Sequence, residues 1–450
     1  MISVTKESAP DFPTAAFPLL HNEQLRSNVR HATDVIQAKR FRVVTEMPDW
    51  QLLRDAGEQI RNRTLEYLDT YLQEFEQHCT TAGGHVHWAR DATEANRIVS
   101  QLAQNETGKV IKIKSMTTEE IGLNHALEAV GIQPIETDLA ELIVQLGHDR
   151  PSHIVVPALH KDRHEVRELF ARTLNLPDLG DRPEDLTEAA RVYLRQQFLR
   201  APVAISGANF LIAETGGVCI VESEGNGRMC LTLPQTLITI AGIDKVVPRF
   251  RDLEVLLQLL PRSATGERMN PYNSLWTGIH PGDGPQEFHV VLLDNRRTDI
   301  LHDPEARETL HCIRCGACQN ACPVYRQTGG HAYGSVYPGP ISAILTPQLA
   351  LMREGKSLPY ASSLCGACYE VCPVKINIPE ILIHLRGRVV NEQPKLVRAL
   401  YPEAIAMRAM QWIFLSETRL KMAQWMGRMA QRPFIGRSGW IEKLPGTLGG

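Results

Sequence analysis

Two short clusters between residues 312 and 372 contain seven of the ten cysteines. The first cluster has the spacing C-x2-C-x2-C-x3-C-P and consists of Cys312, Cys315, Cys318 and Cys322, followed by Pro323. Bacterial ferredoxins use this run to bind iron–sulfur clusters, and they direct the fourth thiolate to the neighbouring cluster. The spacing therefore predicts a segment that holds iron and transfers electrons one at a time.

The second cluster of cysteines repeats the first at a fixed offset. CGACQNACPV begins at Cys315 and CGACYEVCPV begins at Cys365, so the second copy supplies Cys365, Cys368 and Cys372. An internal duplication of this kind favours a ferredoxin-like fold that binds two clusters about a pseudo-twofold axis.

The crossed ligands of such domains assign the seven thiols. Cluster 1 is predicted to use Cys312, Cys315, Cys318 and Cys372, and cluster 2 is predicted to use Cys322, Cys365 and Cys368. The position in the second half that corresponds to Cys312 holds Ser362. We expect a 4Fe–4S centre as cluster 1. For cluster 2 three alternatives stay open: a 3Fe–4S centre, a 4Fe–4S centre with Ser362 or water as an oxygen ligand, or a 4Fe–4S centre whose open iron meets a partner or substrate.

Zinc is the alternative occupant, because CxxC pairs also bind this metal in tetrahedral sites. Seven cysteines in a repeat whose two halves both end in Cys-Pro are more typical of iron–sulfur proteins. Between the two clusters lies a glycine- and proline-rich loop with His331, Tyr333 and Tyr337. We interpret it as a packed loop whose aromatic rings shield a cluster from water, in preference to a lid that supplies a ligand.

Strands and helices alternate ahead of the cysteines. The predicted strands cover 85–89, 109–113, 133–136, 152–157, 203–206, 210–213, 218–222 and 289–293. Helices are expected to begin at Asp91, at Thr117, where Glu120 would complete a capping box, and at Asp138. Further helices are expected over 51–80, 161–175 and 184–199. This alternation favours a parallel sheet covered on both faces.

A chain of 450 residues is too long for one ordinary core, and we divide it into four regions. They are an N-terminal arm (1–50), an α/β domain (51–295), an iron–sulfur domain (300–388) and a helical C-terminal region (389–450). The fold class is α/β. A Rossmann-like domain with a parallel-rich sheet and helices on both faces precedes an α-helical, bacterial-ferredoxin-like two-cluster domain and a helical tail.

Polar residues near the glycine turns of the α/β domain form a candidate ligand cleft. Open α/β sheets bind ligands at the carboxyl ends of their strands, and the N–H groups of glycine turns suit a carboxylate or a phosphate. The candidates are Lys114, Ser115, Asn209, Glu214, Thr215, Gly216, Glu224, Asn226 and Arg228. The alternative is that these glycines only form turns. Since no GxGxxG follows the early strands, no nicotinamide or flavin site is predicted.

Other chemically capable residues have simpler interpretations. His148, His153, His160 and His164 are close in sequence, and we favour surface or helix-capping roles over a second metal site. We expect the isolated thiols Cys79, Cys219 and Cys230 to be structural. The tail carries Met407, Met410, Trp412, Met422, Trp425, Met426 and Met429, which could dock a partner or a membrane surface but more often pack on their own domain.

The bulk composition excludes several classes of function. A formal net charge of −3 leaves no electrostatic footprint for nucleic acid. The N-terminus lacks the pattern of a secretory signal, and the apolar runs are shorter than a transmembrane segment requires. We therefore expect a cytoplasmic protein, with peripheral membrane contact through the tail left open.

The cysteine segment, CIRCGACQNACPVYRQTGGHAYGSVYPGPISAILTP with LPYASSLCGACYEVCPVKINIPE, closely resembles the lactate utilization protein B family. The upstream blocks KIKSMTTEEIGLNHALE (112–128), PSHIVVPALHK (151–161) and VESEGNGR (221–228) are similar to that family as well. The resemblance runs from about 40 to 445, and family members usually continue past the final KLPGTLGG. It implies an N-terminal LUD domain, similar in fold to folate cyclo-ligases and sugar-phosphate isomerases, and a second motif with three cysteines.

The resemblance also implies a process, the oxidation of L-lactate to pyruvate together with two other proteins. Our leading hypothesis is an iron–sulfur electron-transfer subunit of that oxidoreductase complex, which relays single electrons through two clusters to an acceptor not identified by the sequence. The alternative is that this chain is itself the catalytic hydroxy-acid oxidoreductase, with the substrate at the incompletely ligated cluster or in the LUD cleft. A redox or iron sensor is the third hypothesis, but the sequence shows neither a helix-turn-helix signal nor a basic patch.

Overall fold

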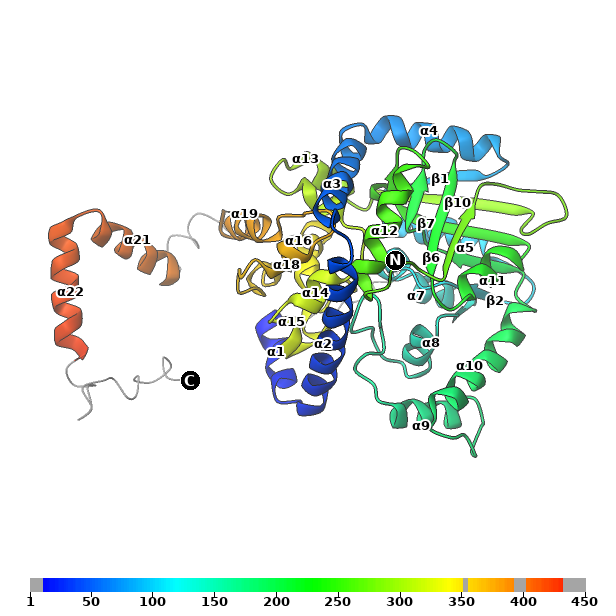
Figure 1. The fold of residues 1–450 in the computed structure, drawn as a ribbon, viewed down its shortest axis with the longest axis horizontal. Coiled ribbons are helices and arrows are strands. Elements are labelled where there is room, and N and C mark those ends of the chain that lie inside the picture. Colours follow the sequence, from blue (N-terminus) through cyan, green and yellow to red (C-terminus); the bar gives the residue numbers. More distant parts are fainter. Residues whose placement is uncertain (1–10, 351–354, 392–401, 432–450) are drawn as a thin grey trace. The chain divides into compact units, whose positions relative to one another are not determined.

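The computed structural model describes residues 11–350, 355–391 and 402–431. The chain divides into two compact units, Met1–Arg386 and Gly387–Gly450. The first unit contains a parallel sheet, its covering helices and the cysteine segment (Figure 1).

Six parallel strands form the main sheet, in the order β1-β10-β7-β4-β2-β3. Their bounds are β1 His85–Ala89, β2 Lys109–Lys112, β3 Gln133–Glu136, β4 Val203–Ser206, β7 Thr236–Gly242 and β10 Glu287–Leu293. In this register β10 lies between the first strand and β7, with His289 opposite His85 and Ile238. The parallel-rich sheet expected from the sequence is confirmed.

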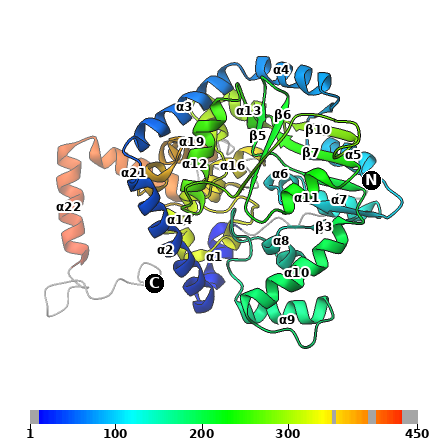
Figure 2. The same cartoon turned by 45° about the vertical axis from the view of Figure 1, so that its right-hand side comes forward.

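The two faces of the main sheet are covered differently. Successive side chains of a strand point to opposite faces. In β10, Val291 packs in the core shared with α5 (Ala92–Leu102) and α7 (Leu123–Ala129). Its neighbour Val290 packs in the core shared with α4 (Leu68–Thr81) and a smaller sheet. Helices therefore cover both faces, and the smaller sheet adds to one of them (Figure 2).

The smaller sheet has the strand order β8-β5-β6-β9. Its strands are β5 Phe210–Ile212, β6 Gly217–Glu222, β8 Val246–Val247 and β9 Tyr272–Trp276. The remaining helices between residue 116 and the cysteine segment are α6 Met116–Glu120, α8 Leu139–Leu146, α9 Arg163–Thr173, α10 Pro183–Phe198, α11 Asn226–Thr232, α12 Asp252–Ala264 and α13 Arg297–His302.

The strand predicted over 152–157 is wrong. These residues form an irregular loop in which the N–H of Ser152 donates to the carbonyl of Pro157. The imidazole Nδ1 of His153 accepts the N–H groups of Val155 and Val156 at 3.0 and 3.1 Å. The backbone groups that a strand would offer to a neighbouring strand are thus bonded within the loop or to side chains outside it, such as Gln319, which accepts the N–H of Ile154.

Two helix starts also differ from the prediction. Ser115, not Thr117, caps α6 and accepts the N–H of Thr118, so the capping box with Glu120 does not form. Asp138 precedes α8 as expected, but its carboxylate accepts the N–H of Lys114 instead of a helix N–H. The segment 51–80 forms two helices, α3 (Trp50–Glu66) and α4, which meet at Tyr67.

The cysteine segment is helical and lies against the N-terminal helices (Figures 1 and 2). Its helices are α14 Ala317–Ala321, α15 Tyr325–Thr328, α16 Pro340–Leu349, α18 Ala367–Val371 and α19 Ile378–Asn391. The predicted N-terminal arm contains the helices α1 (Phe12–Leu20) and α2 (Glu23–Thr45), which contact this segment. Leu25 and Val29 of α2 share a buried cluster with Tyr325.

The second unit contains α21 (Pro402–Phe414) and α22 (Glu417–Gln431), which contact each other. The methionines and tryptophans that the sequence analysis singled out in this tail are exposed. Across the described residues, none of the helices combines the length and the apolar character needed to cross a membrane.

The core of the main sheet provides a first prediction. Ile240, at the centre of β7, is fully buried, and Ile240→Ala would leave a cavity there. We expect the free energy of unfolding to fall by about 2–5 kcal/mol, measured by urea denaturation followed by circular dichroism. Val130→Ala, at an exposed site, is the control and should change it by less than about 0.5 kcal/mol. Equal effects of the two variants would contradict the assigned core.

Candidate iron–sulfur centre and ligand cleft

The two cysteine loops have the same backbone conformation. Arg314 and Leu364 occupy equivalent positions and have positive φ angles of 61° and 56°. Gly316 and Gly366 follow with φ angles of 75° and 83°, and each directly precedes a short helix, α14 or α18. Left-handed conformations are unfavourable for residues with a Cβ atom, so their recurrence shows that the duplication in sequence is also one in structure.

The thiols predicted for cluster 1 line a single cavity. They are Cys312, Cys315, Cys318 and Cys372. Burial and then the nearby thiols Cys372 and Cys312 raise the pKa of Cys315. Four thiolates brought together in this environment need compensating positive charge, and iron ions supply it. The donor set and its burial fit an iron–sulfur cluster, although the ligand assignment stays a prediction.

The thiols predicted for cluster 2 lie nearer the surface. Cys322 and Cys368 are buried, whereas Cys365 is exposed. The pKa of the Cys322 thiol is raised by burial and also by the neighbouring Cys365. The pKa of Cys365 is lowered, because the N–H of Ala367 and the hydroxyl of Ser363 stabilise its thiolate. This second group therefore combines two internal sulfurs with one that faces solvent.

Ser362 occupies the place of a cysteine in the second half. In the first half, the N–H of Arg314 donates to Sγ of Cys312 at 3.4 Å. In the second half, the N–H of Leu364 donates to Oγ of Ser362 at 3.1 Å. The matching hydrogen bonds place an oxygen where the first half offers a sulfur.

The spacing of the sulfurs differs from that of a zinc site. A tetrahedral zinc with Zn–S bonds of about 2.3 Å would hold its sulfurs about 3.8 Å apart. Within the described ranges 11–350, 355–391 and 402–431, the one group of three candidate ligands whose atoms all lie within 4.8 Å is Asp149, His160 and His331. No three cysteine sulfurs in these ranges lie within that distance of one another.

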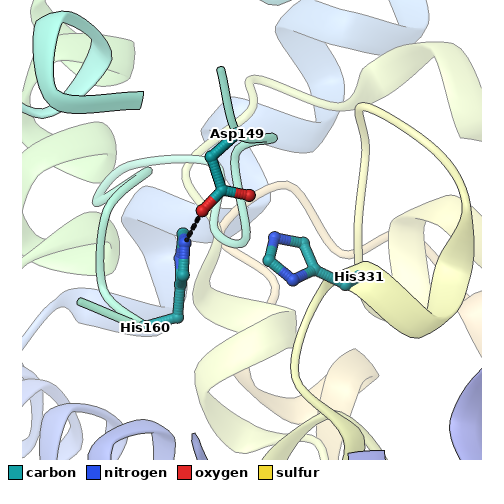
Figure 3. A group of neighbouring side chains, drawn as sticks. All are labelled: Asp149, His160 and His331. Atoms are coloured by element: carbon teal, nitrogen blue, oxygen red, sulfur yellow. Dashed lines mark hydrogen bonds and ion pairs between the residues drawn. The ribbon is translucent and has the colours of Figure 1, made fainter. Parts of the chain in front are cut away.

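The Asp149 group has the residue types of a metal site, but its ligand atoms have other partners (Figure 3). Nε2 of His160 contacts Asp149 at 3.0 Å, and the Lys161 ammonium contacts the same carboxylate oxygen at 2.8 Å. Nε2 of His331 donates to the carbonyl of Arg150 at 2.9 Å. A cation would have to displace the Lys161 ammonium, so we do not assign a metal here.

The four histidines close in sequence have different environments. His148 and His164 are exposed, in line with the surface interpretation. His153 is buried instead, and its Nε2 donates to Oδ1 of Asn320 in α14 at 3.0 Å. The surface interpretation is wrong for His153 because its ring joins the 152–157 loop to the cysteine segment.

A buried ion network lies between the main sheet and the first cysteine loop. The guanidinium of Arg297 donates twice to Glu120, at 2.9 Å each, and once to Asp244 at 2.6 Å. Burial acts to raise the pKa of both carboxyl groups, but Arg297 outweighs it, and both pKa values are lowered. Two carboxylates therefore stay ionised inside the protein.

Two side chains of the cysteine segment complete this network. The hydroxyl of Tyr337 donates to Glu120 at 2.5 Å. Arg314 lies over the Tyr337 ring, 4.7 Å from its centroid, and its Nη2 is 3.7 Å from Asp244. Tyr333 is buried as well, beside Cys322, so both tyrosines of the predicted loop are packed inside. Whether they shield a cluster from water stays a prediction.

A cleft lies at the carboxyl edge of the main sheet, and we call it the sheet-edge cleft. It is lined by residues that follow β2, β4, β6 and β7, by the end of α12, by the loop residue Ile154, and by Ile313 and Arg314 of the first cysteine loop. Of the predicted ligand-cleft residues, Lys114, Ser115, Asn209 and Glu224 line it. Ile154, Ile313 and Arg314 also line the cysteine cavity, so the two spaces share a wall.

The other predicted cleft residues are placed elsewhere. Glu214 accepts the N–H of Phe250, and Thr215 and Gly216 form the turn between β5 and β6. A Cβ atom on Gly216 would lie 2.2 Å from the N atom of Cys79. Asn226 donates to Thr137, and the Arg228 guanidinium lies 5.1 Å above the ring of Tyr272. These five residues are outside the set that lines the sheet-edge cleft.

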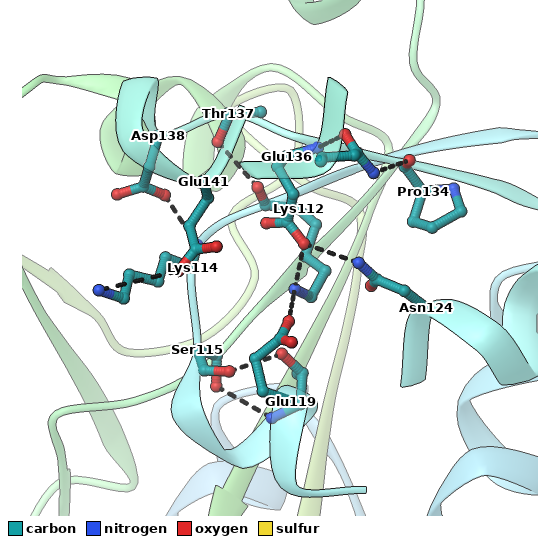
Figure 4. A network of polar contacts seen from close by, with 12 residues as sticks. Lys112, Lys114, Ser115, Glu119, Asn124, Pro134, Glu136, Thr137, Asp138 and Glu141 are labelled. Atoms are coloured by element: carbon teal, nitrogen blue, oxygen red, sulfur yellow. Dashed lines mark hydrogen bonds and ion pairs between the residues drawn. The ribbon is translucent and has the colours of Figure 1, made fainter. Parts of the chain in front are cut away.

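Two lysines at the end of β2 have separate roles (Figure 4). Lys112 is fully buried and contacts Glu136 at 2.5 Å and Glu119 at 3.1 Å. Lys114 points away from that group and donates to the carbonyl of Ile154. Lys112 therefore stabilises the sheet, whereas Lys114 joins the sheet to the loop that walls the cleft.

Three contributions to the site were missing from the sequence analysis. Lys245 lines the sheet-edge cleft directly after β7, a strand that the sequence analysis does not place. Arg314 stands inside the cysteine motif without a predicted role. Arg40 and Arg54 of the N-terminal helices donate to the backbone carbonyls of Val371 and Cys372. A basic residue next to the end of a strand is the sequence signal that could have identified Lys245. The contacts of Arg40 and Arg54 join segments that are far apart in sequence, so no local signal could have identified them.

The comparisons with known proteins agree with this division. The LUD domain family matches residues 72–293, and the 4Fe-4S dicluster domain family matches residues 308–376. "Lactate utilization protein B" of Bacillus licheniformis is 44% identical over 434 residues, which cover 95% of this chain and 90% of that protein. The Bacillus subtilis protein of the same name is 44% identical over 95% of this chain and 89% of its own length.

A further relative is named for electron transport. The "Uncharacterized electron transport protein YkgF" of Escherichia coli is 46% identical over 392 residues. The match covers 86% of this chain and 82% of that protein.

The buried His153 predicts a dependence of stability on pH. Burial lowers its pKa to about 4, against about 6.5 in an unfolded chain. The neutral ring therefore stabilises the fold above pH 6.5, and this contribution, at most about 3 kcal/mol, is lost as the pH falls from about 6.5 towards 4. Urea denaturation at several pH values should show a weaker dependence in His153→Gln. The exposed control His164→Gln should keep the wild-type slope, and equal slopes in wild type and His153→Gln would refute the assignment.

Proposed function

Since the chain belongs to the lactate utilization protein B family, we propose that it is the iron–sulfur electron-transfer subunit of an oxidoreductase complex that converts L-lactate to pyruvate. The substrate comes from the names of the relatives. The electron-transfer role is supported by one observation above all: two groups of thiols gather in one duplicated segment.

The two groups of thiols are close to each other. Cys318 and Cys368 lie on α14 and α18, helices that contact each other, and Cys368 adds to the burial that raises the pKa of Cys318. In the proposal, Cys312, Cys315, Cys318 and Cys372 hold a 4Fe–4S cluster, while Cys322, Cys365 and Cys368 hold a second cluster of the 4Fe–4S or 3Fe–4S type. Such clusters supply one-electron chemistry and can divide the two-electron oxidation of a hydroxy acid into single steps.

The surface near the second thiol group suits contact with a redox partner. Cys365 is exposed, and Tyr360, Leu364 and Tyr369 around it are 37–51% exposed despite their apolar character. Electrons would therefore leave or enter the chain here, whereas the first thiol group lies at the inner end of the path. The partners in the proposal are the other two proteins of the lactate system and an electron acceptor.

A second candidate function has one observation in its favour. The sheet-edge cleft shares Ile154, Ile313 and Arg314 with the cysteine cavity, so a substrate in the cleft would lie beside cluster 1. In that case the chain is itself the hydroxy-acid oxidoreductase. L-lactate should then reduce the clusters of the isolated, anaerobic chain without any partner, and unchanged oxidised clusters would exclude this role.

The relay proposal is tested by electron paramagnetic resonance on the anaerobically reconstituted chain. Reduction should give two magnetically interacting clusters. Cys372→Ser should weaken the signal of cluster 1 and spare cluster 2, whereas Cys322→Ser should do the reverse, because each cysteine is proposed to ligate the cluster of the other half. Cys79→Ser, far from the motif in sequence, is the control. A chain that binds zinc and gives no cluster signal in any redox state would refute the proposal.

Ser362 decides the nature of cluster 2. If the serine leaves one iron site empty, the oxidised wild type shows a three-iron signal. Ser362→Cys should remove that signal and raise the iron content by about one atom per chain, because a thiolate completes the set. Ser100→Cys, in α5 and outside the cysteine segment, should leave the spectrum unchanged. A three-iron signal that persists in Ser362→Cys would show that this position does not face the cluster.

A further inference from the structure

We propose that the sheet-edge cleft binds a small carboxylate, held by the Lys245 ammonium and the Arg314 guanidinium. The carboxylate follows from the geometry described below. Its identity as a three-carbon 2-hydroxy or 2-oxo acid rests on the proposed function.

Lys245 is a buried side chain that lines the cleft, and burial lowers its pKa to about 7 although the nearby Asp244 acts in the opposite direction. It lies in the short turn Ile243–Lys245 after β7, and 7% of its surface is exposed. It lines the cleft at the carboxyl edge of the sheet, where open α/β sheets bind ligands. Among the residues that the structure describes, its ammonium has no hydrogen-bonding or ion-pairing partner. A buried charge of this kind is costly unless an anion compensates it.

Arg314 supplies a second cation with a free donor. Its Nη1 atom is buried and, within the described part of the chain, has no hydrogen-bond acceptor. The Tyr337 ring, 4.7 Å from the guanidinium, and Asp244, 3.7 Å from Nη2, fix its orientation. An arginine held in this way presents its remaining N–H groups in a geometry that suits a carboxylate.

The acids that line the cleft already have hydrogen-bond donors or a nearby cation. The carboxylates of Glu222, Glu224 and Asp138 accept backbone N–H groups. Glu267 lies 3.5 Å from the Lys39 ammonium. The lining acids therefore already have donors, whereas the Lys245 ammonium and Nη1 of Arg314 have no acceptor among the described residues, and a carboxylate ligand would supply one.

The size and lining of the cleft favour a short carbon chain. Its volume is about 270 Å³, slightly below the range of about 300–1,000 Å³ typical of sites for drug-sized ligands. Apolar side chains such as Ile154, Leu260 and Ile313 line the same cleft as the two basic side chains. A small carboxylic acid offers the anionic group to the cations and its carbon chain to these side chains, whereas a phosphate ion has no apolar part to match them.

A competing explanation assigns the two cations to the cluster itself. Cys312 lies close enough to act on the pKa of both Lys245 and Arg314. These two basic side chains could therefore offset the negative charge of a cluster. The two explanations differ in what a substitution changes. Loss of a ligand anchor weakens acid binding, while loss of a compensating charge alters the reduction potential of cluster 1 alone.

The test uses the full-length, anaerobically reconstituted chain and three probes: L-lactate, pyruvate and inorganic phosphate. Calorimetric titration should show one site per chain for an acid, and the acid should shift the cluster 1 resonance. Lys245→Met and Arg314→Gln should each weaken acid binding about 10- to 100-fold, since each removes a charge-assisted hydrogen bond. Lys109→Gln, at an exposed position of β2 remote from the lining residues, should bind the acid as the wild type does.

Each result decides the proposal. Absence of lactate and pyruvate binding in the wild type, tighter binding of phosphate than of either acid, or an unchanged affinity in both variants would overturn it. An unchanged affinity with a shifted potential would assign the cations to the cluster. Iron content is measured for each variant, and if Lys245→Met loses its clusters, Arg314→Gln and the wild-type titration decide.

The outcome is separable from that of the relay proposal. Two interacting clusters in a chain that binds no acid would overturn this site and leave the relay standing. Acid binding in a chain that holds no cluster would leave the site standing and overturn the relay.

Discussion

The buried guanidinium of Arg297 is the interaction on which the arrangement of this protein depends. It follows β10 in the chain, and its two carboxylate partners come from the end of α6 and from the turn after β7. Removal of one partner from a buried ion pair typically costs about 3–5 kcal/mol, because the other charge is left uncompensated. Glu120 and Asp244 in turn hold Tyr337 and Arg314, so the cysteine loop is bonded to the edge of the sheet through charges that water does not screen.

This connection gives the sheet edge and the cysteine cavity a common boundary. Ile154 and Ile313 line both spaces and so belong to their common wall. The thiols of the first group are buried or half-buried, and Arg54 of the N-terminal helices bonds to the carbonyl of Cys372, whereas the second group is open to solvent at Cys365. The duplicated halves thus have one backbone design and two environments, and environment and solvent exposure are among the factors that set the reduction potential of a cluster.

Local signals made the thiol motif and most strands predictable from sequence. Strands such as His85–Ala89 and Gln133–Glu136 alternate with capped helices, and the cysteine spacing is itself the signature of its chemistry. The apolar run of Thr236–Gly242 is buried on both faces and has no period of two, so the central strand β7 carried no such signal. The apolar segment 152–157 has the sequence pattern of a strand but is not one, because the buried His153 accepts N–H groups of its backbone. Lys245 and Arg314 meet only through the tertiary fold.

The strand register also sets an order of events during synthesis. β1 has β10 as its neighbour in the sheet, so His85 can pair with His289 only after that residue has left the ribosome, roughly 200 residues later. The contacts of the N-terminal helices are completed later still, since Gln37 and Arg40 donate to the carbonyls of residues 320 and 371. Pairings between such distant segments form slowly, and the exposed apolar surface of an unfinished chain invites aggregation. A nascent chain of this protein therefore completes the contacts of its first helices only after both cysteine loops have been made.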